Sequence, residues 1–148
     1  MIRLATKTDE PSIKECAEQA YARYVPLIGR KPTPMVADFA AQIDAGEVFV
    51  ATDDQDQLQG FIVFIVEEEH VLLENVAVVP SAAGQGIGKA LISFCEAFAR
   101  TKNLGSVQLY TNEKMIENLS IYAKLGYTEL DRRSEDGFNR VYFEKALN

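Results

Sequence analysis

The segment from Val76 to Leu91 constrains the fold of this chain more than any other segment. It reads Val-Ala-Val-Val-Pro-Ser-Ala-Ala-Gly-Gln-Gly-Ile-Gly-Lys-Ala-Leu, so an apolar strand meets a proline, a glycine-rich loop and an amphipathic helix. Glycine lets the backbone approach an anion and adopt dihedral angles that other residues resist. The first amides of a helix lack intrahelical acceptors, and the helix dipole favours negative charge there. The segment therefore predicts a phosphate or pyrophosphate site built mainly from backbone. A glycine-rich turn without a ligand is the alternative.

Two common phosphate-binding motifs do not match this loop. A Walker loop requires Gly-x-x-x-x-Gly-Lys-Ser/Thr, but Gly88-Lys89 is followed by Ala90, and position 83 is alanine. A dinucleotide fingerprint requires Gly-x-Gly-x-x-Gly, whereas the spacing here is Gly-x-Gly-x-Gly. The pattern Gln/Arg-x-x-Gly-x-Gly/Ala does match, through Gln85, Gly88 and Ala90. The loop thus resembles the acyl-coenzyme A loop of the GNAT superfamily of acyl-CoA N-acyltransferases.

A second stretch strengthens this resemblance. Residues 118–127 read Asn-Leu-Ser-Ile-Tyr-Ala-Lys-Leu-Gly-Tyr, which is similar to the GNAT helix that carries Asn or Ala, then Leu/Ile-Tyr, and ends in Gly-Phe/Tyr. The length of 148 residues predicts one domain. The resemblance covers essentially the whole chain and implies a single GNAT-type domain over residues 1–148. The expected fold is α/β, with a mixed, mostly antiparallel sheet of about seven strands, four helices and a splayed central pair of parallel strands.

Apolar periodicity and turn residues predict the individual elements. Strands are expected at 2–5, 48–51, 58–66, 71–79 and 107–110, with a final hairpin of 127–133 and 140–144 around Asp136-Gly137. Helices are expected from Asp9-Glu10-Pro11 to about residue 24, at 35–45, from the glycine loop to about Lys102, and at 113–125 before a left-handed cap at Gly126. A long connection poor in helix is expected around Pro26, Gly29, Pro32 and Pro34.

Composition excludes several classes of protein. Hydrophobic residues make up 47% of the chain, enough to bury a core. The net charge is −7 and no basic patch is present, so we expect no nucleic-acid partner. No apolar run is long enough for a membrane span, and the N-terminus does not read as a signal peptide, so we expect a cytoplasmic protein without a membrane partner. Cys16 and Cys95 fall on apolar helix faces, and we expect reduced, mostly buried thiols rather than a catalytic cysteine.

The resemblance implies that acetyl-CoA is the co-substrate and that no metal takes part. In the family, the strand before the loop splays from its neighbour, and the pantetheine arm pairs with its free backbone groups as an added strand. Val76, Ala77 and Val78 match these positions, with the Val78 amide holding the thioester oxygen. The family often has a basic residue where Ala83 stands, a contact for which Lys89 is the candidate substitute. The pyrophosphate would be held by the main chain of Gly84, Gln85, Gly86, Ile87, Gly88 and Lys89.

Tyr122 matches the family's general acid, which would protonate the departing thiolate of coenzyme A. A phenol suits this role because its reference pKa of about 10 lies above that of a thiol, about 8.5, so it keeps its proton at neutral pH. A core tyrosine that packs its helix on the sheet is the alternative. Asn118 stands where many relatives carry alanine, and we expect it to hydrogen-bond the coenzyme arm. Capping of its own helix is the alternative.

Glu74 is the candidate general base or amine-orienting group. A carboxylate in an otherwise apolar strand is costly unless it is paired or functional. Because side chains alternate along a strand, Glu74 is expected on the face of Val76 and Val78, with Asn75 on the other. A buried partner for an arginine, an edge-facing carboxylate and a water chain as the base are the alternatives. His70, the only histidine, is expected in a turn rather than as a base or metal ligand.

Acceptor specificity is expected from the first helices, their connection and the last hairpin. Arg132, Arg133 and Arg140 are candidates for an acceptor carboxylate, with surface ion pairs as the alternative. The predicted activity is transfer of an acetyl group to a primary amine of a small molecule or peptide, and a homodimer is compatible with the resemblance. A non-catalytic acyl-CoA-binding module of the same fold is the alternative. The candidate acceptor-binding residues are Tyr21, Tyr24, Leu27, Ile28, Tyr110 and Tyr142.

Overall fold

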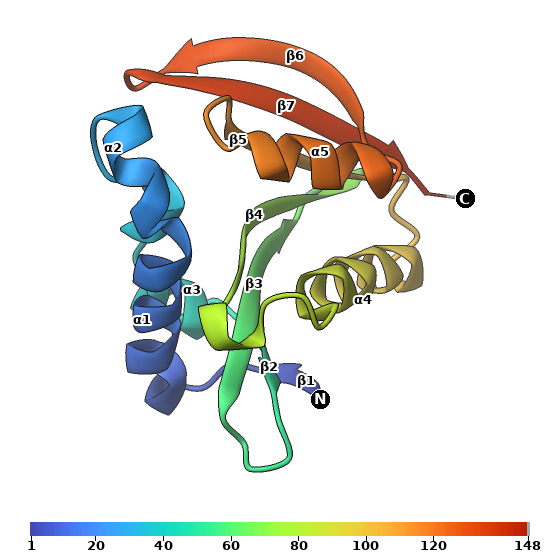
Figure 1. Cartoon of the computed structure of the whole chain (residues 1–148). Helices are drawn as coiled ribbons and strands as arrows, with labels where there is room; N and C mark the ends of the chain where they lie inside the picture. Colours follow the sequence, from blue (N-terminus) through green and yellow to red (C-terminus); the bar gives the residue numbers. More distant parts are fainter. Residues whose placement is uncertain (148) are drawn as a thin grey trace.

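The computed structural model describes residues 1–147, which form one seven-stranded sheet with helices on both faces (Figure 1). The strands pair in the order β1-β2-β3-β4-β5-β7-β6, and every neighbouring pair is antiparallel except β4 and β5. This confirms the predicted mixed sheet with a parallel pair inside it. The strands are β1 (Ile2–Leu4), β2 (Val48–Thr52), β3 (Leu58–Val66), β4 (His70–Val78), β5 (Ser106–Asn112), β6 (Thr128–Glu135) and β7 (Phe138–Ala146).

The helices confirm the four expected ones and add a single turn. The α-helices of the described chain are α1 (Glu10–Tyr21), α2 (Val25–Ile28), α3 (Phe39–Asp44), α4 (Ile87–Thr101) and α5 (Ile116–Lys124). The short helix α2 lies in the segment expected to be poor in helix. Pro26 is tolerated in its first turn because the missing amide would have no acceptor there, and Gly29 ends it at a φ of 94°.

Helix α3 begins later than the predicted residue 35. The side chain of Asp38 accepts a hydrogen bond from the amide of Ala41 at 3.1 Å and caps the helix. The three residues Thr33–Met35 form a separate 3₁₀ turn. The cap, rather than the first apolar residue, therefore sets where the helix starts.

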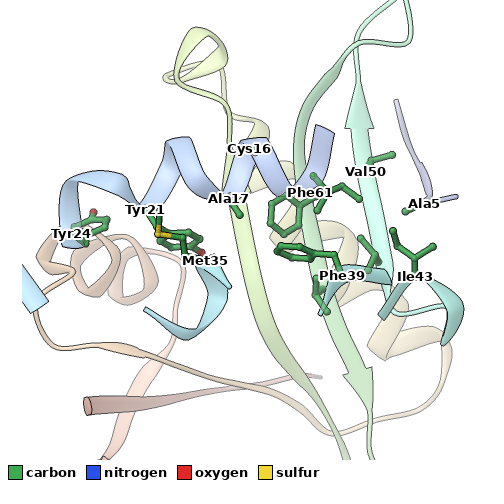
Figure 2. Close-up of a cluster of buried hydrophobic side chains, with 14 of the residues drawn as sticks. Ala5, Cys16, Ala17, Tyr21, Tyr24, Met35, Phe39, Ile43, Val50 and Phe61 are labelled. Carbon is green, nitrogen blue, oxygen red and sulfur yellow. The ribbon is translucent and has the colours of Figure 1, made fainter. Parts of the chain in front are cut away.

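The two faces of the sheet carry separate hydrophobic cores. Figure 1 shows α1 and α4 on opposite sides of β3 and β4. Figure 2 shows the core under α1 and α3, where Phe39 meets Phe61 edge to face with ring centroids 5.5 Å apart. The other core joins α4 and α5 to the sheet. Cys16 and Cys95 are buried, one in each core, and burial raises the pKa of both thiols to about 12. The prediction of buried, free thiols is confirmed.

Strands β4 and β5 separate halfway along their length. Their parallel ladder ends at Leu73 and Leu109. Beyond that point β4 continues against β3 as far as Val78, while β5 continues against β7 as far as Asn112. This confirms the predicted splayed parallel pair, and it leaves β4 with an open backbone edge over residues 74–78.

A β-bulge in β4 lies where the strands separate. Val63 of β3 is opposite Asn75, and the next residue, Phe64, is opposite Leu73, so Glu74 has no partner on β3. The extra residue reverses which side chains of β4 face which side of the sheet. Leu73 packs in the α4 core, whereas Asn75, two residues later, contacts Tyr21 of α1 on the other face. A bulge of this kind re-aims side chains, and bulges are common beside active sites.

The bulge overturns one prediction about Glu74. Its carboxylate accepts a hydrogen bond from Gln42 of α3 at 3.3 Å, so it lies on the α1 and α3 side of the sheet. Val76 packs in the core on the α4 side. The expectation that Glu74 shares a face with Val76 and is opposed by Asn75 is therefore wrong, because simple alternation fails across the extra residue.

Candidate functional site

A long groove with a volume of about 620 Å³ follows the open edge of β4. Its walls come from the end of α1, the glycine loop with the first turn of α4, and α5. Every residue proposed to hold the coenzyme lines it except Gln85, whose side chain is exposed. We call this the long groove.

The β4 edge presents free backbone groups to the long groove. The amide of Val79 donates to the carbonyl of Gln59 on β3 at 2.9 Å. Because backbone groups alternate in direction along a strand, the amides of Val78 and Val76 point away from β3. The carbonyl of Val76 also points that way, since it accepts a hydrogen bond from the hydroxyl of Tyr21 at 3.0 Å. An extended ligand can therefore pair with this edge as an added strand.

The glycine loop lies at one end of the long groove, and its backbone amides have no hydrogen-bond acceptor in residues 1–147. Gly84 and Gly86 have φ values of 81° and 79°, a region that favours glycine. Gly86 is the N-cap of α4 and offers no side chain to cap it. Within residues 1–147, none of the amides of residues 84–89 donates a hydrogen bond. These donors and the positive end of the dipole of α4 form a site for an anion.

Tyr122 of α5 lies in the wall of the long groove. Its side chain is 6% exposed, and its ring centroid is 6.0 Å from that of Tyr127 and 5.9 Å from that of Phe143. No group in the described chain hydrogen-bonds its hydroxyl. Burial raises the pKa of the Tyr122 phenol above its ordinary value, so it keeps its proton at neutral pH. Its ring has the packing of a core residue, and its hydroxyl is available to a ligand.

Asn118 lies one turn before Tyr122 and also lines the long groove. The N-cap of α5 is Met115, and no side chain caps the helix there. The side-chain amide nitrogen of Asn118 lies 3.6 Å from the sulfur of Met115. Helix capping by Asn118, the alternative considered from the sequence, is therefore wrong.

A second, small cavity of about 40 Å³ lies between the splayed strands, next to the long groove. Tyr21, Val76, Asn118 and Tyr122 line both spaces. A water needs about 10–15 Å³ of such space, so the small cavity has room for about three waters or a small polar group. It is bounded further by Leu73, Glu74, Asn75, Tyr110, Thr111, Asn112, Met115, Phe138, Arg140 and residues 32–34.

Glu74 is the carboxylate of the small cavity. Its pKa is raised above the ordinary value, first by burial and then by the negative charges of Glu47 and Glu67. No arginine pairs with Glu74 in the described part of the chain, so the alternative of a buried ion pair finds no support. A carboxylate with a raised pKa in a cavity is a candidate proton acceptor.

Replacing Glu74 with glutamine is expected to raise the melting temperature at neutral pH. A raised folded-state pKa means that the carboxyl supports the fold below its ordinary value of 4.5, and that this support is lost as pH rises through the raised value. The neutral amide avoids that loss. The difference in melting temperature should therefore grow from near zero in acid to its full size at neutral pH.

Thermal unfolding of Glu74→Gln and wild type across pH measures this difference. Glu68→Gln, in the exposed turn before β4, is the matched control and should show no such trend. A stabilisation by Glu74→Gln that stays constant over the same pH range would contradict the proposed cause.

Tyr21 and Tyr24 tie the end of α1 to the site. The Tyr21 hydroxyl lies 2.8 Å from Oδ1 of Asn75 as well as beside the Val76 carbonyl, and the Asn75 amide donates to the carbonyl of Pro34 at 2.9 Å. The Tyr24 hydroxyl donates to Glu117 of α5 at 2.9 Å. Both tyrosines are buried in the α1 core, as Figure 2 shows.

Of the four other residues predicted to bind the acceptor, one lines the small cavity and three do not. Tyr110 lines the small cavity. Leu27 is 60% exposed, Ile28 packs on the α1 core, and neither lines the groove or the cavity. Tyr142 lies behind Tyr110, with ring centroids 5.4 Å apart, and its hydroxyl donates to Glu135.

Only one of the three arginines predicted to bind an acceptor carboxylate lies at the small cavity. Arg132 pairs with Glu129 at 3.1 Å, and Arg133 pairs with Asp131 at 2.9 Å, both on the exposed strand β6. The surface ion-pair interpretation is confirmed for these two. Arg140 alone of the three lines the small cavity. Gln42 and Phe138, which the sequence analysis missed, carry no motif or unusual spacing that could have identified them.

Residues 1–147 contain no cluster of metal-ligating side chains and no helix of membrane-spanning character. No group of three or more His, Cys, Asp and Glu side chains in that range could hold a metal ion. None of the helices described is long and apolar enough to cross a membrane. His70 begins β4 directly after the turn at 67–69 and lines neither the long groove nor the small cavity.

The candidate site thus combines an open β-strand edge, a loop of free amides at one end and a buried phenol beside it. Residues 44–129 match the model of the Acetyltransferase (GNAT) domain. The chain therefore belongs to the GNAT acetyltransferase family.

Similar proteins support this assignment. The chain is 32% identical over 94 residues, 60% of its length, to a mycothiol acetyltransferase of Renibacterium salmoninarum. It spans less than half the length of the curated relatives it matches, 28% in this case. The ribosomal-protein-S18-alanine N-acetyltransferase of Escherichia coli has the same fold, with a TM-score of 0.79 and 20% identity over 99% of this chain and 93% of that one. A PaiA N-acetyltransferase of Thermoplasma acidophilum, solved in complex with coenzyme A, has a TM-score of 0.76 and 18% identity over 99% and 98% of the two chains.

Proposed function

We propose that this protein transfers an acetyl group from acetyl-CoA to a primary amine by direct attack. One observation carries the proposal: four residues at the open edge of β4 and on the facing helices, Tyr21, Val76, Asn118 and Tyr122, line both the long groove and the small cavity. A donor in the long groove and an acceptor in the small cavity would therefore lie beside the same residues. That the PaiA relative was solved with coenzyme A supports the choice of donor.

The long groove would hold the donor. The pantetheine arm would pair with the free edge of Val76 to Val78, and the amides of residues 84–89 would bind the pyrophosphate. Asn118 would hydrogen-bond the arm near the thioester. This arrangement needs no metal to neutralise the phosphates, because backbone donors and the helix dipole serve that purpose.

The small cavity would hold the amine and remove its proton. The amine nitrogen attacks the thioester carbon, and the Val78 amide stabilises the developing oxyanion. Before the attack, Glu74 accepts one proton from the ammonium, directly or through a water, because only the neutral amine has a lone pair. The carbon–sulfur bond then breaks, and Tyr122 gives its proton to the thiolate. The acetylated nitrogen loses its second proton, which returns through water to the Tyr122 oxygen, and Glu74 releases its proton to solvent. The products are the acetylated amine and coenzyme A.

Acetyl-CoA and free coenzyme A are expected to bind without added metal, and acetyl-CoA should release thiol when an amine is supplied. Calorimetry in the presence of a chelator measures the binding, and a thiol-release screen against amines, amino acids and peptides measures the transfer. Absence of binding in chelator would contradict the proposal. Binding without thiol release from any acceptor would favour the second candidate, a non-catalytic acyl-CoA-binding module.

A further inference from the structure

Arg140 of β7 holds a nearly buried positive charge at the wall of the small cavity. Its side chain is 11% exposed. The guanidinium stacks over the rings of Tyr110 and Phe138, at 4.7 and 5.5 Å from their centroids. Stacking on two rings fixes the plane of the guanidinium, which suits it to recognise a planar anion.

The protein leaves most of the hydrogen-bonding capacity of Arg140 unused. A guanidinium has five N–H donors, and in the described chain one of them bonds, to the Thr33 hydroxyl at 3.2 Å. The single enclosed side-chain N or O atom without a partner in that part of the chain belongs to Gln42. The other N–H groups of Arg140 are therefore not sealed in the core, and they are open to the small cavity or to water.

The neighbouring carboxylate pairs with this charge at long range. Glu135 forms an ion pair with Arg140 at 3.6 Å, longer than a hydrogen bond, and it also accepts a hydrogen bond from the Tyr142 hydroxyl. Glu135 is also 39% exposed, so water screens the pair. A buried charge is expected to have a well-placed partner, since an unpaired one is costly. Arg140 thus has room for a second carboxylate.

A charge of the opposite sign faces the same cavity from across β5. Glu74 lies on β4 and Arg140 on β7, the two strands that flank β5. Tyr110 of β5 lies between them: burial raises the pKa of its phenol, the positive charge of Arg140 lowers it, and the negative charge of Glu74 raises it. The small cavity therefore presents a negative group and a positive group on either side of one aromatic ring.

We propose that the acceptor is a small amino carboxylate, an amino acid in the simplest case, whose carboxylate is held by Arg140. Its amine then points toward Glu74 and the place where the small cavity meets the long groove. The small cavity, with room for about three waters, would take the carboxylate end of such a zwitterion, and the amine end would lie beside the residues that line both the cavity and the long groove. This assignment rests on the proposed function and adds the substrate class to it.

The test compares amino acids with their amides in the thiol-release assay with acetyl-CoA. The amide keeps the amine and the side chain but lacks the carboxylate charge. A hydrogen bond to a charged group contributes about 1.5–3 kcal/mol, so kcat/KM should be about 10- to 150-fold higher for the best amino acid than for its amide. Equal kcat/KM values, or a preference for peptides, would overturn the assignment while leaving the proposed acetyl transfer intact.

Two variants locate the effect. Arg140→Gln should remove the preference for the amino acid over its amide, because it should raise the KM of the amino acid far more than the KM of the amide. Arg140→Lys keeps the positive charge but lacks the planar guanidinium. Its preference for the amino acid over the amide should therefore lie between those of the wild type and Arg140→Gln. Arg132→Gln, which removes a surface arginine of the same hairpin that pairs with Glu129, should behave as wild type. An unchanged preference in Arg140→Gln would overturn the role of this residue.

A binding measurement keeps the two proposals separate. Calorimetric titration of the same amino acids into the protein saturated with free coenzyme A reports acceptor binding without turnover. Amino acid binding that Arg140→Gln abolishes would support the assignment even if no transfer were detected. Coenzyme A binding in all variants shows that they fold, and its absence in wild type would refute the proposed function itself.

Discussion

Gly86→Asp is expected to abolish coenzyme A binding. Gly86 is the N-cap of α4, at the centre of the unpartnered amides that would hold the pyrophosphate. A carboxylate there would occupy the anion site and repel the phosphates. Two unit charges 4 Å apart interact by about 4 kcal/mol at an effective dielectric constant of 20, so the dissociation constant should rise about a thousand-fold. Calorimetry with free coenzyme A measures this directly.

The chain supplies a matched control for this substitution. Gly46 has a φ of 75°, against 79° for Gly86, and an added Cβ at either position meets no atom within 4 Å. Gly46→Asp therefore carries the same backbone strain and the same charge, but it lies between α3 and β2, outside the long groove. Normal binding by Gly46→Asp together with lost binding by Gly86→Asp would assign the effect to the anion site. Normal binding by both would show that the loop does not hold the phosphates.

The geometry of the proposed coenzyme site was predictable where it is built from backbone. Strand, glycine loop and helix are adjacent in the sequence, and the residue types alone indicate positive φ and free amides. The structure places Gly84 and Gly86 in that conformation and opens β4 at Val76 to Val78. Local chemistry predicted the glycine conformations and the free amides, whereas the open edge of β4 was expected from the resemblance to the GNAT family and depends on how β4 and β5 pair with β3 and β7.

The acceptor side was less predictable because it depends on contacts between distant segments. The bulge at Glu74 results from the pairing of β4 with β3, and the alternation of apolar residues along β4 does not predict the extra residue. Arg140 lies over the rings of Tyr110 and Phe138 at the small cavity, whereas Arg133 lies over the ring of Tyr142 on the exposed strand β6, and the local sequence does not distinguish the two. Leu27, an apolar residue expected at the site, instead lies exposed on α2.

Tyr122→Phe is expected to lower kcat while sparing the fold and coenzyme binding. The ring provides the packing against Tyr127 and Phe143, and phenylalanine keeps that ring. No group in residues 1–147 hydrogen-bonds the hydroxyl, so its removal leaves no protein group without a partner. The variant should therefore match the wild type in melting temperature and in coenzyme A affinity.

The catalytic loss follows from the proton that the hydroxyl would supply. The thiolate of coenzyme A needs a proton only as the carbon–sulfur bond breaks, so the loss should appear in kcat and not in the KM for acetyl-CoA. General acid catalysis contributes about 10²- to 10⁴-fold, and because a thiolate can leave unassisted the low end of that range is expected. Steady-state kinetics with the best acceptor measures this. Tyr127→Phe, which removes a hydroxyl bonded to Glu96 away from the groove, is the control and should cost stability rather than kcat. If Tyr122→Phe keeps the full kcat, Tyr122 has only a packing role, and water rather than this phenol protonates the thiolate of coenzyme A.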